Sequence, residues 1–491
     1  MSGLVKKMTK WQIVLGLQVV ASLLLLAFVL KLGALPAMYL GILGVLLLVL
    51  LLINFFLMKP SKKEGKGKVR EAVGKIVSLL LSVVLIVGSI YIGQGNDVLA
   101  GITGAKEEIN RYNVYTLTTN QAVSVEDLSF YHIGMSKAYD TEEHYLEAHN
   151  ALLNDNSKIR IEEYEDYSLL LTDLLSGKIE AICVNEAFNG VFEEQNKDFM
   201  SSVKVVWSHD IIEQIEDFTK KVDVTNSVFT IYISGIDATG KVATVSRSDV
   251  NMLVTVNPVT KDILMTSIPR DYYVTLANKG KKDKLTHAGL AGVENSVKTI
   301  ENFMGVEVNY YAKVNFTSLI KMVDALGGIT INVPKDFRAN ADKSYFKKGV
   351  QVLNGKQALA FVRERYAFGG GDGDRVANQQ KVLKAMLDKA MSPAVITNYT
   401  RLLSAVDGSF ETNMTSEEIV DLIKMQLHDM TSWNFHSTVL TGSGKLMTGG
   451  AYMPNNKLYY CVPHQNTVDR AADLIKRMTA GEKITTDSTV E

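Results

Sequence analysis

Arginines and carboxylates recur between residues 237 and 379 at spacings that suit phosphate chemistry. Arg247 and Asp249 are two residues apart in a strand-like stretch, so the pattern predicts that both point to the same side. Guanidinium forks match phosphate oxygens, and two nearby carboxylates can hold a Mg²⁺ ion that bridges phosphates. No obvious serine or cysteine nucleophile with a base accompanies them. The residue types therefore favour a site for a pyrophosphate.

A glycine turn precedes this pair. Residues 235–241 fit the G-x-x-x-x-G-K spacing of a phosphate-binding loop, but Val242 stands where that loop needs Ser or Thr to hold Mg²⁺. The run that follows favours a strand, whereas a phosphate-binding loop leads into a helix. Asp237 within the turn is therefore either a turn residue, a role that aspartate favours anyway, or a second carboxylate close to Asp249.

Further polar residues follow along the chain. Arg270 comes directly after a proline at a predicted strand end, a usual place for a functional group in an α/β fold. Arg363 and Arg365 are predicted to share one face of a strand, "FVRERY". Arg375 and Gln379 are four apart at the start of a predicted helix and lie one above the other. Any one of these residues alone more often belongs to a solvated face, so the hypothesis depends on the whole set.

The elements that must position these residues alternate between strands and helices. Strands are predicted at residues 228–237, 248–258, 262–269, 329–334 and 357–366. Helices are predicted at residues 292–305, 316–328 and 375–391, the first two with glycines where helices commonly end. The simplest architecture is an α/β fold, with a mixed central sheet covered by helices.

Residues 95–215 predict a separate, small α/β unit. A strand is followed by a helix from Tyr167 to Gly177 and by a second strand, "IEAICV". The simplest role for this accessory domain is interaction or spacing, without a ligand of its own. A second hypothesis is that it binds a partner protein or regulates the domain that follows.

Three uncharged apolar runs, at residues 11–30, 35–58 and 76–93, have about the length that a helix needs to cross a bilayer. Lysines precede the first run and crowd the segment between the second and third, while the first connection carries only Lys31. Because basic flanks face the cytoplasm, we expect a cytoplasmic N-terminus, three spans and an extracellular chain after about residue 94. No signal-peptide cleavage site follows the first run.

Charge is segregated along the chain, although the formal net charge is only −1. Residues 95–222 carry a net charge of −14, and residues 225–391 carry +8. A basic extracellular domain suggests an anionic partner, with nucleic acid not expected outside the cell. Cys183 and Cys461 are too few for a disulfide scaffold, and neither cysteines nor histidines show a metal-ligand spacing. We expect two buried, unpaired thiols.

Five segments, in order across about 150 residues, resemble the LytR–CpsA–Psr (LCP) family. They read "SGIDATG…SRSDVNMLVTVNP", "MTSIPRDYYV", "VDALGGITINVP", "LNGKQALAFVRERY" and "GDGDRVANQQKVL". With three spans and an inserted acidic domain, the chain is most similar to the family's capsule-biosynthesis members. One departure is "KLTHAG", where many relatives carry an asparagine, which leaves the roles of Thr286 and His287 open.

The resemblance implies an extracytoplasmic, Mg²⁺-dependent phosphotransferase, with Mn²⁺ as an alternative ion and pyrophosphatase activity as a side reaction. Such enzymes move a glycopolymer, here a capsular polysaccharide or related anionic polymer, from an undecaprenyl-pyrophosphate carrier to peptidoglycan. The metal ligands it implies are Asp237 and Asp249, and the catalytic residues are Asp249 and Arg270. The pyrophosphate contacts it implies are Arg247, Arg270, Arg363, Arg365, Arg375 and Gln379. It also implies an apolar tunnel for the polyprenyl chain, and capsule-assembly membrane proteins are candidate partners.

The resulting domain prediction is a membrane anchor over residues 1–94, an acidic accessory domain over 95–222 and an LCP catalytic domain over 223–485. The alternative function is a non-enzymatic regulator, a transcriptional attenuator of capsule synthesis that binds a polyprenyl phosphate. A pure binder would not need two metal-binding carboxylates, which is the feature that separates the two hypotheses.

Overall fold

The computed structural model describes residues 10–60, 67–103, 107–138, 140–236, 242–369, 372–392, 405 and 410–484. The chain divides into two compact units. The first comprises Met1–Thr103, Met391–Asp407 and Thr415–Ser432. The second comprises Gly104–Ala390, Gly408–Met414 and Trp433–Glu491, and it carries the predicted functional residues.

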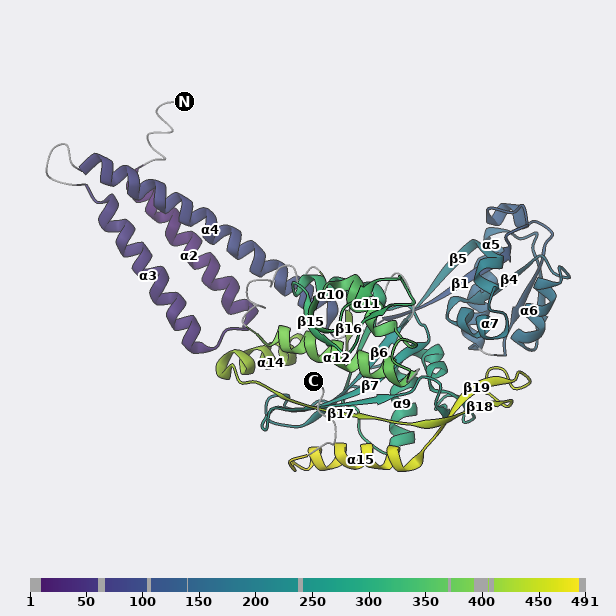
Figure 1. The fold of residues 1–491 in the computed structure, drawn as a ribbon. Helices are drawn as coiled ribbons and strands as arrows, with labels where there is room; N and C mark the ends of the chain where they lie inside the picture. The colour runs from purple at the N-terminus through teal and green to yellow at the C-terminus, as the bar shows by residue number, and fades with distance from the viewer. Residues whose placement is uncertain are drawn as a thin grey trace. The chain divides into compact units, whose positions relative to one another are not determined.

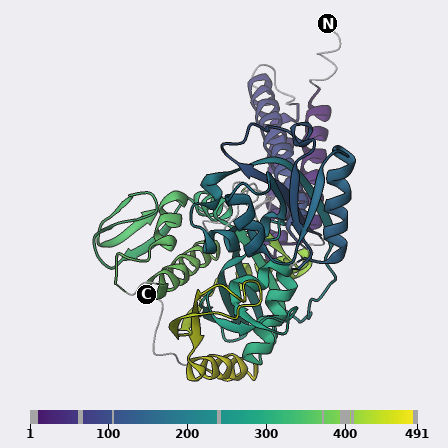
Figure 2. The ribbon, with the colours of Figure 1, turned by 90° about the vertical axis from the view of Figure 1, so that its right-hand side faces the viewer.

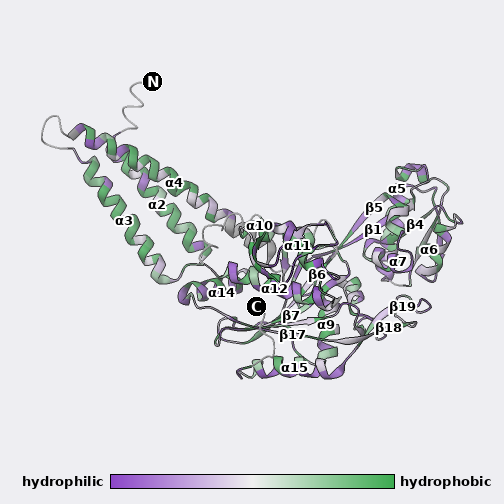
Figure 3. Ribbon diagram, in the orientation of Figure 1, coloured by the Kyte–Doolittle hydropathy of each residue, from purple (hydrophilic) through white to green (hydrophobic). Residues whose placement is uncertain are grey.

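Three long helices dominate the first unit: α2 (Trp11–Leu32), α3 (Ala37–Met58) and α4 (Gly67–Ile102). Each contains a segment long and apolar enough to cross a membrane, and Figure 3 shows all three as largely hydrophobic. The three predicted spans are therefore confirmed as helices suited to anchor the chain in a membrane. The third helix extends well beyond the predicted run at both ends.

A polar cluster joins the three helices inside this apolar bundle. The Gln18 side chain accepts hydrogen bonds from Asn54 Nδ2 at 2.8 Å and from Ser78 Oγ at 2.7 Å. All three side chains are buried. Such interhelical hydrogen bonds fix helix packing where lipid offers no hydrophobic driving force. The first unit also contains α14 (Ser416–Asp429), an amphipathic helix that begins with a capping box.

A six-stranded sheet forms the centre of the second unit, in the order β16-β11-β6-β7-β8-β17 (Figure 1). Its strands are β6 (Phe229–Ile236), β7 (Ser248–Asn257), β8 (Asp262–Ile268), β11 (Tyr310–Asn315), β16 (Phe410–Thr412) and β17 (Asn434–Val439). Strand β11 is parallel to β6 and β17 is parallel to β8, while the remaining pairs are antiparallel. The predicted mixed sheet is confirmed.

Helices cover both faces of this sheet (Figure 1). On one face lie α10 (Phe316–Ala325), α11 (Gly355–Arg363) and α12 (Asp372–Ala390). On the other lie α9 (Gly292–Met304) and α15 (Gln465–Thr479). Helix α9 ends, as predicted, at Gly305 in the left-handed conformation with φ of 63°. The α/β class predicted from the sequence is therefore confirmed.

The prediction of a strand over residues 357–366 is wrong. The segment forms α11, because Asn354 caps the helix through Gln357 and the buried side chains Ala358, Phe361 and Val362 follow the i, i+3, i+4 pattern. Gly355 lets this helix start directly against α10, since a Cβ there would collide with the Ile320 carbonyl.

Shorter strand pairs surround the sheet. They are β9 (Tyr273–Thr275) with β10 (Lys282–Lys284), β12 (Ile329–Val333) with β15 (Gly349–Leu353), β13 (Phe337–Arg338) with β14 (Tyr345–Phe346), and β18 (Gly442–Met447) with β19 (Leu458–Pro463). A short helical turn, η3 (Leu285–Ala291), follows β10 and leads into α9.

The acidic region forms a second sheet of five strands, in the order β3-β2-β4-β1-β5, drawn in blue in Figure 2. The strands are β1 (Glu107–Leu117), β2 (His132–Ser136), β3 (Arg160–Tyr164), β4 (Ala181–Asn185) and β5 (Val203–Gln214). Its helices include α5 (Glu142–Asp155), α6 (Tyr167–Leu175) and α7 (Asn189–Gln195). The predicted helix at Tyr167 and the strand after it are confirmed.

One continuous apolar cluster contains side chains from both sheets of the second unit. Phe188 of the accessory domain meets Tyr452 with ring centroids 5.5 Å apart. The backbone of Ile109 in β1 also bonds residues 243 and 245 next to β7. Cys183 and Cys461 are both buried, as predicted, and neither forms a disulfide within the described residues. The accessory domain is thus packed into the second unit by a shared core.

Candidate active site

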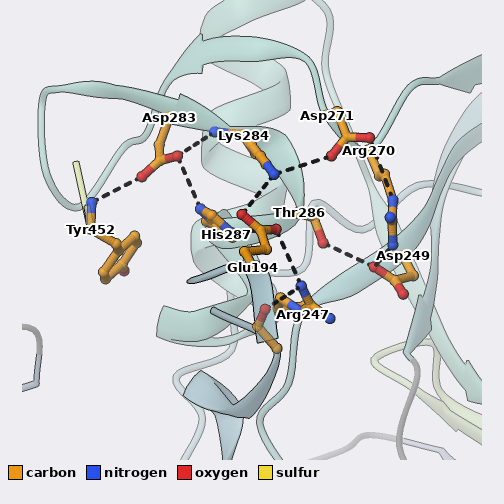
Figure 4. A network of polar contacts seen from close by, with 11 residues as sticks. Glu194, Arg247, Asp249, Arg270, Asp271, Asp283, Lys284, Thr286, His287 and Tyr452 are labelled. Carbon is orange, nitrogen blue, oxygen red and sulfur yellow. Dashed lines mark hydrogen bonds and ion pairs between the residues drawn. The ribbon is translucent and has the colours of Figure 1, made fainter. Parts of the chain in front are cut away.

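Asp249 and Arg270 face each other across the ends of two antiparallel strands (Figure 4). Asn251 of β7 pairs with Ile268 of β8, and continuing this register by two residues brings Asp249 opposite Arg270. Arg270 Nη1 donates to Asp249 Oδ1 at 2.9 Å, and Thr286 Oγ1 donates to the same oxygen at 3.3 Å. The two residues predicted to be catalytic are therefore in direct contact.

Two further charged residues, Asp271 and Lys284, lie next to the Asp249–Arg270 pair. Arg270 Nε lies 3.6 Å from Asp271 Oδ2, and Lys284 Nζ lies 3.7 Å from Asp271 Oδ1. Backbone bonds from Leu285 to Tyr272 and from Thr286 to Arg270 tie the segment after β10 to the segment after β8. Residues 249, 270 and 284–287 are thereby brought to one edge of the sheet.

Glu194, from α7 of the accessory domain, enters the same cluster (Figure 4). Its carboxylate accepts a hydrogen bond from Lys284 Nζ at 2.7 Å and one from Arg247 Nη1 at 3.4 Å. Burial would raise the pKa of Glu194, but His287 and Lys284 outweigh it and hold that pKa well below its usual range. Glu194 is therefore a permanent anion at this position.

His287 is fully enclosed beside two acids. Its Nδ1 lies 3.0 Å from Asp283 Oδ1, and its Nε2 lies 3.7 Å from Glu194 Oε1, which is an ion-pair distance and too long for a hydrogen bond. Burial alone would lower the pKa of His287, but attraction to Asp283 and Glu194 raises it to about 9. Asp283 is fixed in turn by the backbone N–H of Tyr452 at 2.9 Å.

The strand alternation used to place Arg247 does not hold here, because the pairing of β7 with β6 shifts its register between Val250 and Ser248. Strand β7 begins at Ser248, so Arg247 precedes the strand and the alternation of strand faces does not apply to it. Its guanidinium donates to the Gly190 carbonyl at 3.1 Å and to Glu194, while Asp249 bonds Arg270. Arg247 and Asp249 thus belong to one network of charges, but they have different partners.

Arg363 and Arg365 do not share a strand face, because the strand is absent. Arg363 is the last residue of α11, is exposed, and lies over the Phe316 ring at 4.6 Å from its centroid. Arg365 is half-buried and follows the helix. The intervening Glu364 caps the turn by accepting from the backbone N–H groups of residues 365, 366 and 367.

Arg375 and Gln379 do lie on a helix, as predicted. Arg375 is buried near the start of α12, and Gln379 is half-buried one turn further on. The next residue, Gln380, donates to Ser267 Oγ at 2.9 Å and to the Thr438 carbonyl at 3.2 Å. These bonds fix the first half of α12 against the end of β8, the strand from which Arg270 emerges.

The predicted lining of a lipid tunnel is partly buried. Val376 and Val382 of α12 are buried, and a larger set of apolar side chains on α10 and α12 is half-buried. That set is Leu319, Ile320, Met322, Leu383, Met386 and Leu387. The tunnel itself stays a prediction.

The proposed metal site is described only in part, because Asp237 lies outside the described residues. Asp249 contributes one carboxylate, and one or two carboxylates with waters and phosphate oxygens are a common set for Mg²⁺. Asp249 therefore fits such an ion. Within the described part of the chain, no group of three or more His, Cys, Asp or Glu side chains could hold a metal on its own.

Sequence reasoning missed half of this network. Asp283 and His287 are four apart, a spacing that could have suggested a pair, but the segment was not predicted as helical. Lys284 carried no signal beyond its charge. Glu194 could not have been found from spacing, because it is 90 residues from Lys284 along the chain and belongs to another domain.

The chain thus combines three helices long and apolar enough to anchor it in a membrane with a mixed α/β domain that gathers guanidinium, ammonium and carboxylate groups at one sheet edge. A model of the LytR_cpsA_psr family matches residues 199–475. The chain belongs to this family.

Two relatives are named polyisoprenyl-teichoic acid–peptidoglycan teichoic acid transferase TagU. The Bacillus cereus protein is 34% identical over 247 residues, which cover 50% of this chain and 77% of that protein. The Bacillus licheniformis protein is 36% identical over 216 residues, covering 44% and 69% respectively. Among solved structures, that of B. subtilis TagV has 30% identity and a TM-score of 0.44, and the match covers 53% of this chain and 99% of that one.

Proposed function

We propose that this protein is a membrane-anchored phosphotransferase that moves an anionic glycopolymer from an undecaprenyl-pyrophosphate carrier to peptidoglycan. The polymer we propose is a capsular polysaccharide, following the resemblance to the capsule-biosynthesis members of the family. Relatives whose names specify transfer of teichoic acid from a polyisoprenyl carrier to peptidoglycan support the general reaction. The observation that carries the proposal is the contact between Asp249 and Arg270 within a cluster of further cations.

In this reaction an acceptor hydroxyl oxygen on peptidoglycan attacks the phosphorus that carries the glycopolymer. A new P–O bond forms, the bond from that phosphorus to the bridging oxygen breaks, and undecaprenyl phosphate leaves with the bridging oxygen and its electron pair. Arg270 neutralises negative charge on the pyrophosphate as the bond breaks. The base we propose for the hydroxyl proton is Asp249, which bonds Arg270 at 2.9 Å, so that charge and atoms balance.

Mg²⁺, or alternatively Mn²⁺, would be held by Asp249 and Asp237. When bound, such an ion would withdraw negative charge from the phosphate oxygens. Arg270 shares Asp249 Oδ1 with Thr286, and this keeps the carboxylate oriented toward the sheet edge. Hydrolysis of the pyrophosphate by water is the side reaction expected of the same arrangement.

We place the reaction outside the cytoplasm. The basic residues that flank the spans favour a cytoplasmic N-terminus, which would put both sheets on the outer side with the peptidoglycan acceptor. The partners are then the lipid-linked polymer, the wall and the bilayer, with capsule-assembly membrane proteins as further candidates. Nucleic acid is not expected as a ligand.

The test is transfer by the full-length protein in liposomes, with a radiolabelled undecaprenyl-pyrophosphate-linked polymer and peptidoglycan sacculi. We expect label to become attached to the sacculi, and Asp249→Asn and Arg270→Gln to reduce the rate by at least about 100-fold. A wild-type protein that binds the lipid but transfers no label would support the regulatory alternative. Unchanged rates in both variants would refute the assigned roles.

A further inference from the structure

The accessory domain places a carboxylate inside the candidate active site. Glu194 projects from α7 and bonds Lys284 and Arg247, which belong to the domain that carries the proposed chemistry. Lys284 is in turn 3.7 Å from Asp271, and Asp271 is 3.6 Å from Arg270. A continuous chain of charges thus runs from the accessory domain to the Arg270–Asp249 pair (Figure 4).

Arg247 is fitted closely to α7. Besides its bond to Glu194, it donates to the Gly190 carbonyl at 3.1 Å. A Cβ at position 190 would overlap the guanidinium, so only glycine leaves room for Arg247 in this position. The carboxylate of Glu194 and the space left by Gly190, both on α7, therefore fix the position of the Arg247 guanidinium.

Glu194 is the one carboxylate that contacts all three cations of this cluster, while His287 also contacts Asp283 and Lys284 also contacts Asp271. Lys284 is 5% exposed and His287 is 1% exposed, so water cannot solvate their charges well. Without the carboxylate, Arg247, Lys284 and His287 would repel one another and the long side chains would move apart. With it, they are held in one place before an anion arrives.

Helix α7, which carries Glu194, is held firmly in place by its apolar side chains. The helix that carries Glu194 also buries Val191 and Phe192 in the apolar cluster that both sheets share. Moving α7 away from the site would expose these side chains to water, which strongly opposes such a movement.

We propose that Glu194 is a positioning residue of the transfer site, and that the accessory domain forms one wall of its pyrophosphate-binding region by orienting Arg247 and Lys284. This inference rests on the proposed function. It gives the accessory domain a direct part in the reaction, which neither an inert spacer nor a domain with a separate partner would have.

The first test compares Glu194→Gln with Glu108→Gln in the liposome transfer assay on the full-length protein. Glu108 is a matched control, because it is also an accessory-domain carboxylate that crosses to the other sheet. It accepts from the backbone N–H of Val293 at 2.9 Å and lies 3.9 Å from Lys313, and neither residue belongs to the cluster. We expect Glu194→Gln to lower kcat/KM by about 10- to 100-fold and Glu108→Gln to leave it within about twofold. Equal effects of the two variants would overturn the proposal.

The second test asks whether Glu194 acts through Arg247. Gly190→Ala changes no charge but pushes the guanidinium out of place, so we expect it to lower kcat/KM as well. In an Arg247→Gln background, Gly190→Ala should have almost no further effect, and Glu194→Gln should keep only the part of its effect that passes through Lys284. If the effects on kcat/KM of Gly190→Ala and Glu194→Gln each simply add to that of Arg247→Gln, the role of Glu194 is a general structural one and the positioning role is refuted. Gly190→Ala keeps the test decisive if Glu194→Gln fails to fold.

The two proposals fail in different ways. If the wild-type protein transfers no label, the proposed function is wrong. If the wild-type protein transfers label at a normal rate and Glu194→Gln and Gly190→Ala do so equally well, the function stands and the positioning role is wrong.

Discussion

Replacing His287 with glutamine should change how the stability of the second unit depends on pH. His287 is fully buried between Asp283 and Glu194, and its pKa is raised from the ordinary 6.5 to about 9. A group whose pKa is higher in the folded state stabilises the fold fully below its unfolded pKa. That contribution is lost as the pH rises through the folded pKa, here between about 6.5 and 9.

The size of the effect follows from the two pKa values. Each pH unit between the unfolded and the folded pKa corresponds to about 1.4 kcal/mol. The charged His287 therefore contributes about 3 kcal/mol to the free energy of unfolding at pH 6 and almost nothing at pH 10. Glutamine is neutral throughout and cannot contribute in this way. The difference in the free energy of unfolding between wild type and His287→Gln should therefore shrink by about 3 kcal/mol from pH 6 to pH 10.

The assay is urea unfolding of the full-length protein in detergent at five pH values, followed by tryptophan fluorescence, because Trp207 is buried in the second unit. The pKa of His144 in the accessory domain is also raised to about 9, through Asp140 and Glu213 against the effect of burial. It titrates in both proteins, so its contribution cancels in the difference.

A difference between the two proteins that stays constant from pH 6 to pH 10 would refute this reasoning. It would mean that His287 is neutral in the fold and that Glu194 is not compensated by a charged imidazole. If the difference in the free energy of unfolding grows with pH, burial lowers the pKa of His287 by more than the two acids raise it.

Three further outcomes are expected. Removing divalent ions with EDTA should abolish transfer, and Mg²⁺ or Mn²⁺ should restore it; full activity in EDTA would rule out the metal role of Asp249. Tyr232→Phe should lower stability by about 1–3 kcal/mol in urea unfolding, since the buried hydroxyl bonds Ser248 at 2.9 Å and Asn251 at 2.6 Å, and no loss would contradict that pairing. Phe188→Ala should lower the stability of the whole second unit by about 3–5 kcal/mol in a single transition, whereas loss of the accessory sheet alone would show two independent cores.

Much of the fold followed from local patterns. Strand β7 and helix α9 are where alternation and helical periodicity predict them, because apolar spacing and end glycines act within a few residues. The strand prediction for the α11 segment failed because a short apolar run such as "ALAFV" fits a buried strand and a buried helix equally well. The cap at Asn354, which lies before the segment that was considered, decides for a helix.

The candidate site was predictable to a smaller extent. Asp249 was found from its spacing to Arg247 and Arg270 from its place after a predicted strand, and strand pairing brings the two together. Arg247 was assigned to the wrong geometry because the start of a strand cannot be read to one residue from sequence alone. The contact with Glu194 depends on how two domains pack, and no local pattern encodes that.

The most direct measurement of the central claim is the product balance of one reaction in liposomes. The full-length protein, the lipid-linked polymer and peptidoglycan sacculi are incubated together, and both products are quantified over time. Attack at the polymer-bearing phosphorus predicts one undecaprenyl phosphate released for each polymer chain attached to the wall. Polymer that stays on its carrier, or lipid phosphate released with no polymer reaching the wall, would contradict glycopolymer transfer.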